Sequence, residues 1–269
     1  MSADLPIGIF DSGIGGLTVA QAIAEALPHE SLVYFGDTAH LPYGDKSTAA
    51  IQAYSVKICD VLLRQRCKLI VIACNSASAA AAELVREYVG SKARVLNVID
   101  PLVHLVGAQY ANQTVGLIAT RQTVSSNVYR KKLDELNVGI QLRALATPLL
   151  APMIEDGFHD SSVSDEVIRS YLSQPALDGI TALLLGCTHY PLIRGAIDAF
   201  YGGRVAVLDG GRVLAEEVRG ALQELHLLAD GAFPPRHHFY VSDFTRSFEE
   251  STRLFFRRPV QLEHYRLWE

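Results

Sequence analysis

Two cysteines occupy matching positions along the chain and could act as acid–base groups. Cys74 and Cys187 each follow an apolar, strand-like run and precede a segment of helical character. A thiol at the start of a helix meets unpaired backbone N–H groups and the positive end of the helix dipole, both of which stabilise a thiolate. We therefore expect both cysteines to be functional, whereas Cys59 and Cys67 are interpreted as small residues of the core.

Polar residues follow each of these two cysteines. Asn75 and Ser76 come after the first, and Thr188 and His189 come after the second. They offer side-chain and backbone donors to an anionic ligand, although Ser76 or Thr188 alone could equally cap a helix. His189 is a candidate acid–base partner because it lies two residues from a thiol.

A glycine-rich turn, DSGIGGLT, begins at Asp11, directly after the first apolar run. It lacks the lysine of a P-loop and does not match the GxGxxG dinucleotide motif. The simplest interpretation is a tight turn that requires Gly13, Gly15 and Gly16 for their backbone dihedral angles. The functional interpretation is a backbone cradle for a carboxylate, with Asp11 contacting a substrate ammonium or a nearby thiol.

Two further segments are polar enough to contribute to a site. The loop Asp37–Gly44, DTAHLPYG, follows another apolar run and has the composition of a binding loop or of a simple turn. Glu155, taken alone, is interpreted as a surface acid. No group of His, Asp and Glu has the spacing of metal ligands, so we predict no metal site.

Short apolar runs alternate with segments of helical length. Their nearly continuous Val, Ile and Leu content is typical of parallel strands buried on both faces, which predicts an α/β fold. The expected strands are Ile7–Phe10, Leu32–Phe35, Leu69–Ala73, Val95–Ile99, Val115–Ala119, Ala182–Leu185 and Val205–Leu208. The expected helices are Leu17–Leu27, a helix capped by Ser47 and running towards Gln65, Ala77–Val89, Val124–Leu136, Val163–Leu172 and Val213–Leu228. The segment Phe255–Arg258 is interpreted as a solvated helix end.

A weak internal repeat relates two halves of the chain. KLIVIACNS at 68–76 is similar to TALLLGCTH at 181–189, and their cysteines are 113 residues apart. IGIFDS at 7–12 is similar to VGLIATR at 115–121, with a spacing of 109 residues from Asp11 to Thr120. The sequence thus predicts two similar α/β halves, each with a cysteine at the carboxyl end of a strand, where open α/β sheets bind ligands. We expect the tail, 238–269, to pack back on the first half.

The composition excludes several classes of protein. Of the 269 residues, 49% are hydrophobic and 20% are charged, which is ordinary globular usage rather than that of a disordered or fibrous chain. The formal net charge of −5 argues against a nucleic-acid partner. We see no signal peptide and no apolar run long enough to span a membrane. Four scattered cysteines indicate free thiols in a reducing compartment, and we expect a cytoplasmic protein.

The motifs together resemble one family, the cofactor-independent glutamate racemases of bacterial cell-wall synthesis. The matching stretches are IGIFDSGIGGLTV, YFGDTAHLPYGDKS, VIACNSASA, the VGLIATRQTV region and LLLGCTHYPLI. Related aspartate racemases carry a glutamate after the second Cys-Thr, where this chain has His189, and this difference favours glutamate as the substrate.

The resemblance implies a role for each matching residue. Cys74 and Cys187 would be the two catalytic bases, with Cys187 acting on L-glutamate and Cys74 on D-glutamate. Asp11, His189 and Glu155 would assist them as acid–base groups. The residues implied to bind the substrate are Asp11, Ser12, Tyr43, Gly44, Asn75, Ser76, Thr120, Thr188 and His189.

The resemblance also implies the architecture. Two similar, doubly wound α/β domains with mostly parallel sheets would face each other across a cleft that holds the active site. The first domain would comprise 1–99 and 209–269, and the second 100–208. The resemblance implies that the protein uses no cofactor and no metal. It also implies that the protein is a homodimer. The chain departs from the family pattern at Ser76, where Thr is usual, and at His40, where Arg is frequent.

Three other functions compete with this interpretation. The first is an aspartate racemase or another amino-acid racemase of the same family. The second is a cysteine amidase that uses Cys187 with His189 as its base, which leaves Cys74 unexplained. The third is a non-catalytic solute-binding protein, which has no need of paired thiols.

Overall fold

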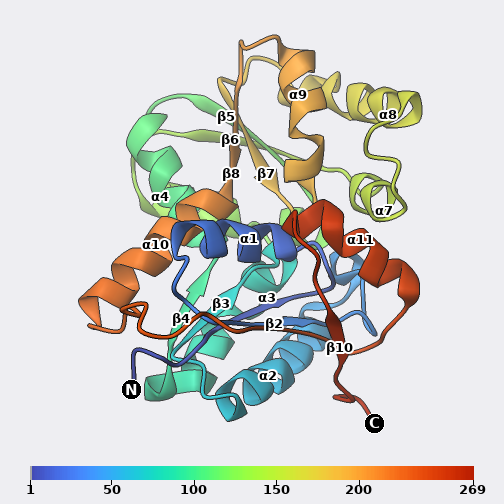
Figure 1. Cartoon of the computed structure of the whole chain (residues 1–269). Helices are drawn as coiled ribbons and strands as arrows, with labels where there is room; N and C mark the ends of the chain where they lie inside the picture. Colours follow the sequence, from blue (N-terminus) through green and yellow to red (C-terminus); the bar gives the residue numbers. More distant parts are fainter. Residues whose placement is uncertain (1) are drawn as a thin grey trace.

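The computed structural model describes residues 2–269, and within them the strands form two parallel sheets (Figure 1). The strands are β1 Ile7–Asp11, β2 Leu32–Gly36, β3 Leu69–Ile72, β4 Arg94–Asn97, β5 Thr114–Ala119, β6 Gln141–Ala146, β7 Ala182–Gly186, β8 Ala206–Asp209, β9 His237–Val241 and β10 Leu262–His264. One sheet has the order β10-β9-β2-β1-β3-β4, and the other has the order β6-β5-β7-β8.

Helices of the described residues cover these sheets. They are α1 Leu17–Ala26, α2 Thr48–Arg64, α3 Asn75–Val89, α4 Ile99–Gln109, α5 Arg121–Ser125, α6 Val128–Glu135, α7 Leu150–Glu155, α8 Ser162–Leu172, α9 Arg194–Tyr201, α10 Gly210–Glu224 and α11 Arg246–Phe256. Every residue of β1, β2, β3 and β7 is buried, as expected for parallel strands covered on both faces. In the larger sheet, neighbouring strand residues such as Ile9 and Phe10 therefore enter different core clusters.

The predicted repeat is confirmed by the topology of the two sheets. The order β2-β1-β3-β4 in one sheet is repeated as β6-β5-β7-β8 in the other. Asp11 ends β1, and Thr120 follows the corresponding strand β5. The fold is therefore two similar, doubly wound α/β domains, as the sequence predicted.

The C-terminal tail returns to the first of these domains, as expected. β9 pairs with β2 and β10 pairs with β9, so that the tail extends the larger sheet. Between these strands, α11 packs against α1, and its Phe255 and Phe256 are buried. The interpretation of Phe255–Arg258 as a solvated helix end is therefore wrong for the two phenylalanines, which join the core cluster that includes residues of α1, while Arg257 and Arg258 are exposed as expected.

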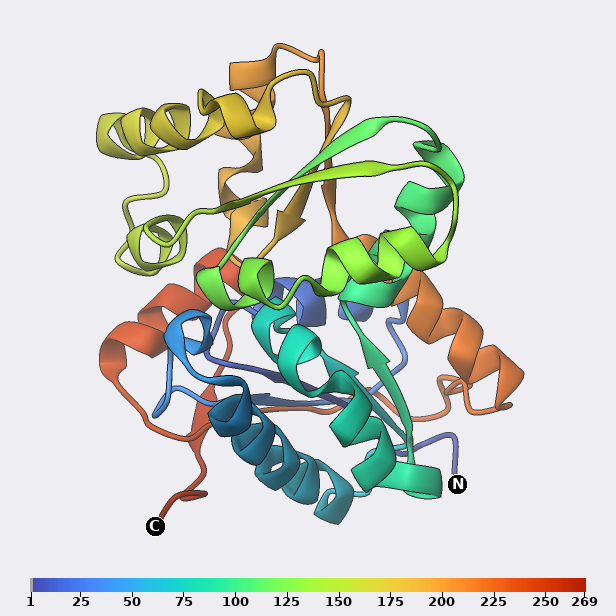
Figure 2. The same cartoon turned by 180° about the vertical axis from the view of Figure 1, so that it is seen from behind.

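Several predicted elements differ in their bounds. The expected helix Val124–Leu136 is divided into α5 and α6 by Asn127, whose φ of 56° is left-handed. The strand Val95–Ile99 ends at Asn97, and α4, which was not predicted, begins at Ile99. Figure 2 shows, from behind, the short helix α5, which follows β5, next to α3 of the other domain. No helix within residues 2–269 combines the length and hydropathy that a membrane span requires.

Candidate functional site

A cavity of about 210 Å³ lies between the two domains at the carboxyl ends of their strands. Most of the residues predicted for the site line it. They are Ser12, Tyr43, Gly44, Cys74, Asn75, Ser76, Thr120, Glu155, Cys187, Thr188 and His189. The remaining lining residues were not singled out as site residues, because they lack polar side chains, although three of them belong to stretches that the sequence analysis quoted. They are Leu41, Pro42, Ala151, Pro152 and Gly186.

Cys74 caps the N-terminus of α3, as the sequence predicted. Its Sγ accepts a hydrogen bond from the backbone N–H of Ala77 at 3.4 Å and donates one to Ser12 Oγ at 3.6 Å. Burial and the nearby Asp11 carboxylate raise the pKa of the Cys74 thiol to about 12, although the contacts with Ala77 and Ser12 oppose this shift. The surroundings of Cys74 therefore favour its thiol form over the thiolate.

Cys187 has a different environment from the one we expected. It is followed by a 3₁₀ helix, Tyr190–Ile193, and α9 begins only at Arg194. The predicted position at the start of an α-helix is therefore wrong for this cysteine, because Pro191 belongs to a short 3₁₀ turn that precedes the helix. Instead, its Sγ lies 3.5 Å from Nδ1 of His189.

His189 is held between two groups that stabilise its cation. Its Nε2 lies 2.8 Å from Oε1 of Glu155, and its Nδ1 faces Cys187. Burial lowers the pKa of His189, but Cys187 and Glu155 together raise it by a larger amount. The resulting pKa of His189 is well above its usual value. Glu155 is thus a partner of a buried histidine, and its interpretation as a simple surface acid is wrong.

Asp11 lies beneath the cavity and does not line it. Its side chain is fully buried, and Oδ2 accepts a hydrogen bond from the backbone N–H of Gly13 at 3.0 Å. Thr188 Oγ1 donates to Oδ1 at 3.5 Å. Burial raises the pKa of Asp11, and His189 partly opposes this effect. Asp11 is therefore placed to act on the cavity through its neighbours.

The glycines after Asp11 are required for close approach, not for unusual dihedral angles. Gly13, Gly15 and Gly16 are absent from the glycines with positive φ in the described chain, so the dihedral interpretation is wrong. A Cβ on Gly16 would lie 2.4 Å from Cβ of Asp11. A Cβ on Gly15 would lie 2.3 Å from Cε1 of His189. The turn is thus shaped around two of the predicted site residues.

Hydrogen bonds connect the two domains around the cavity. Ser76 Oγ lies 2.9 Å from Thr120 Oγ1, so the serine hydroxyl does have a partner in the opposite domain. The hydroxyl of Tyr129 donates to Asn75 Oδ1 at 2.7 Å. Thr18 Oγ1 donates to the carbonyl oxygen of Thr188 at 2.9 Å. These contacts fix the separation of the two cysteine-bearing strand ends.

The Asp37–Gly44 loop is organised by its own buried carboxylate. Asp37 is fully buried and does not line the cavity. The hydroxyl of Tyr43 donates to Asp37 Oδ2 at 2.6 Å, so the proton of this hydroxyl is directed to Asp37. Nδ1 of His40 lies 3.0 Å from the same oxygen, and its ring stacks on Tyr54 at 4.1 Å. His40 is thus part of the support of the loop, a role that the sequence did not reveal.

Gly44 of this loop packs closely against Thr120 of the second domain. A Cβ at this position would lie 2.9 Å from Cβ of Thr120. We expect Gly44→Ala to raise the KM for the substrate about tenfold, because overpacking by a methyl group pushes the loop away from Thr120. Gly195→Ala in α9 is the matched control, since nothing lies within 4 Å of its added Cβ. Steady-state kinetics of both variants test this, and equal KM values would contradict it.

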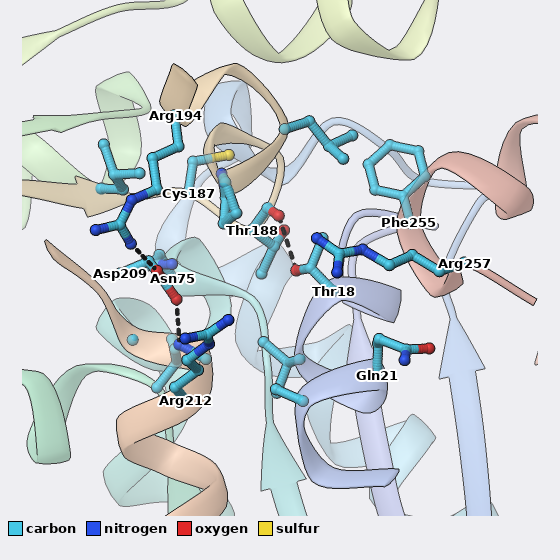
Figure 3. Close-up of a pocket in the computed structure, with 18 of the residues that line it drawn as sticks. Thr18, Gln21, Asn75, Cys187, Thr188, Arg194, Asp209, Arg212, Phe255 and Arg257 are labelled. Carbon is cyan, nitrogen blue, oxygen red and sulfur yellow. Dashed lines mark hydrogen bonds and ion pairs between the residues drawn. The ribbon is translucent and has the colours of Figure 1, made fainter. Parts of the chain in front are cut away.

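A second cavity, of about 350 Å³, lies beside the first (Figure 3). Asn75, Cys187 and Thr188 line both cavities. Figure 3 shows Arg194 directed towards Asp209, and its Nη1 lies 3.0 Å from Asp209 Oδ2. Among residues 2–269, no three His, Cys, Asp or Glu side chains are arranged to share a metal ion.

The fold and the first cavity define a two-domain α/β protein in which each domain supplies one thiol to a shared pocket. Comparison with known proteins identifies the family that has this architecture. The sequence profile of the Asp/Glu/Hydantoin racemase family matches residues 13–218, and the chain belongs to this family. It is therefore an amino-acid racemase, an isomerase.

Individual relatives match along nearly the whole chain. A glutamate racemase of Neisseria meningitidis serogroup A is 40% identical over 256 residues, which cover 95% of this chain and 94% of the relative. A glutamate racemase of Syntrophus aciditrophicus is 38% identical over 255 residues, with coverage of 95% and 94%. The crystal structure of glutamate racemase from Francisella tularensis in complex with D-glutamate matches with a TM-score of 0.92 and 37% identity, covering 99% of both chains.

Proposed function

We propose that this racemase interconverts L-glutamate and D-glutamate. The observation that carries the proposal is that Cys74 and Cys187, one from each domain, line the same cavity. The size of the cavity suits a single amino acid, and hydroxyl and amide groups surround it. Relatives of about 40% identity named glutamate racemase support the choice of substrate.

Two thiols suit this reaction because racemisation removes the α-proton from one face and returns a proton to the other. A single base would have to cross the plane of the substrate. In the proposed mechanism, Cys187 as thiolate takes the proton of L-glutamate, and Cys74 as thiol protonates the opposite face. D-glutamate reacts by the reverse steps, in which Cys74 is the base.

The charges around the two cysteines support this direction. The high pKa of Cys74 favours its thiol form, which is the form that protonates the intermediate. The pKa of His189 is raised by Cys187 and Glu155, and its Nδ1 lies 3.5 Å from Sγ of Cys187, within reach for exchanging a proton. Glu155 orients the imidazole, and Asp11 acts on the Cys74 side. We assign these five residues to proton transfer.

Donors around the cavity would hold the substrate and stabilise the carbanionic transition state. We assign this role to Ser12, Tyr43, Gly44, Asn75, Ser76, Thr120, Thr188 and His189, with Asp11 acting on the substrate through Thr188. Tyr43 contributes its ring and backbone, since its hydroxyl donates to Asp37. Closure of the two domains excludes water, which strengthens these interactions.

We further propose the setting of this activity. The domains divide at 1–99 with 209–269 and at 100–208, a division supported by the membership of the two sheets. The protein acts in the cytoplasm as a homodimer and supplies D-glutamate for peptidoglycan synthesis. No cofactor takes part in the proposed proton transfers.

The deciding experiment is to incubate metal-stripped protein, without pyridoxal phosphate, with L-glutamate in heavy water. Proton NMR follows the loss of the α-proton signal, and a chiral assay of the same sample follows D-glutamate. Both signals are expected together. If folded, reduced protein shows neither signal with glutamate but both with aspartate, the function is aspartate racemisation. Ammonia release from an amide by Cys74→Ser protein would instead indicate a cysteine amidase.

A further inference from the structure

The buried carboxylate of Asp37 is held by donors from distant parts of the chain. Its Oδ1 accepts hydrogen bonds from Ser242 Oγ at 2.7 Å and from Trp268 Nε1 at 2.8 Å. Its Oδ2 accepts the hydroxyl of Tyr43 at 2.6 Å. The carboxylate therefore connects the C-terminal tail with a residue that lines the candidate site.

Trp268, the penultimate residue, is fixed in place by more than this hydrogen bond. Its ring packs edge-on against His40, with 4.4 Å between the ring centroids, and against Tyr54 at 5.3 Å. Lys57 Nζ lies 4.5 Å from the centroid of the indole. The C-terminal segment thus lies beside α2, which carries Tyr54, and the indole also contacts His40 of the Asp37–Gly44 loop.

A displacement of Trp268 must shift Asp37 and then Tyr43, and a displacement of Tyr43 must shift Asp37 and then Trp268. A buried carboxylate is costly unless donors satisfy its oxygens. Removing the indole donor leaves Oδ1 with fewer partners, so Asp37 must move towards its remaining donors. Tyr43 is the tightest partner of Asp37, and it lines the cavity next to Gly44, whose contact with Thr120 tolerates little displacement.

We propose that Trp268 is a positioning residue for the Tyr43–Gly44 part of the glutamate site, and that occupancy of this site is transmitted through Asp37 to the indole. This inference rests on the proposed function, because the ligand that occupies the site is taken to be glutamate. It assigns a role to a C-terminal residue that lies outside every motif of the sequence.

Intrinsic fluorescence tests the transmission directly, because Trp268 is the single tryptophan among the 269 residues. Its emission depends on the hydrogen bond and the charges around the indole. We expect a saturable change in emission as glutamate is added, with a midpoint close to the KM. Tyr43→Phe, which removes the hydroxyl between the cavity and Asp37, should abolish this change at saturating glutamate.

Kinetics of Trp268→Phe test the positioning role, because this variant keeps one aromatic ring for packing and loses the indole N–H donor together with the second ring. We expect the KM for both enantiomers to rise about three- to tenfold, while kcat stays within about twofold. Tyr265→Phe is the matched control. It also lies in the C-terminal tail and loses one hydroxyl, but its ring packs against Phe35 and Tyr240 instead of facing Asp37.

Each remaining outcome has a defined meaning. Constant emission through saturation, in wild-type protein that racemises glutamate, overturns the transmission. A Trp268→Phe variant with a lower melting temperature and an unchanged KM overturns the positioning role and makes Trp268 a packing residue. Wild-type protein that does not racemise glutamate overturns the proposed function, and this inference falls with it.

Discussion

Replacing either Cys74 or Cys187 with serine is expected to lower kcat/KM for glutamate by about 10³-fold or more. A serine hydroxyl is far less acidic than a thiol, so it neither forms the required base nor returns a proton at a useful rate. Both residues line the same cavity, and each is the thiol that its domain supplies to it. A chiral assay of D-glutamate formation measures this loss.

The two serine variants should differ in one respect only. Free L- and D-glutamate have equal free energies in water, so kcat/KM must be the same in both directions for any variant. An asymmetry that identifies the base for each enantiomer must therefore be sought in half-reactions instead of in kcat/KM. In heavy water, Cys74→Ser should still exchange the α-proton of L-glutamate without forming D-glutamate, whereas Cys187→Ser should exchange that of D-glutamate.

Cys59→Ser is the control for these variants. Cys59 is buried within α2, away from the cavity, and burial raises the pKa of its thiol to about 12, as for Cys74. Its replacement should leave racemisation nearly intact. Full activity in either Cys74→Ser or Cys187→Ser would refute the two-thiol mechanism, and equal loss in Cys59→Ser would show that the assay reports folding.

The parts of the fold that were predicted correctly depend on local patterns. Nearly continuous apolar runs marked β1, β2 and β3 because both faces of these strands are buried. The capping role of Ser47 follows from its own side chain, whose Oγ accepts from the N–H of Ala50. The internal repeat predicted the shared topology because the same strand–turn–helix pattern recurs in each half.

The features of the site that the sequence did not predict depend on contacts between residues far apart in the sequence. Ser242 and Trp268 hydrogen-bond to Asp37 across more than 200 residues of sequence. No local sequence pattern around Asp37, Ser242 or Trp268 predicts these hydrogen bonds. Likewise, the 3₁₀ turn after Cys187 breaks the symmetry that the repeat suggested. Local propensity therefore locates a site residue, but the assembled domains decide its partners.

The glycine-rich turn after Asp11 is recognisable from the local sequence, but its function depends on its contact with the distant His189. We expect Gly15→Ala to lower kcat/KM about 10²-fold. The added Cβ would lie 2.3 Å from Cε1 and 2.6 Å from Nδ1 of His189. The ring has little room to retreat, since Glu155 holds its Nε2 and Phe255 packs edge-on against it at 5.5 Å. The imidazole must therefore leave the position in which its Nδ1 faces Cys187, by a distance comparable to those that impair acid–base catalysis.

Gly13→Ala is the matched control in the same turn. Its added Cβ would lie 3.5 Å from Cδ2 of Leu41, an ordinary contact, and the N–H that binds Asp11 is kept. Gly13→Ala should therefore retain most activity, while Gly15→Ala should lose it with a similar melting temperature. If both variants lose activity equally, flexibility of the turn is the common cause. If neither does, His189 reaches its working position by a route that Gly15 does not constrain.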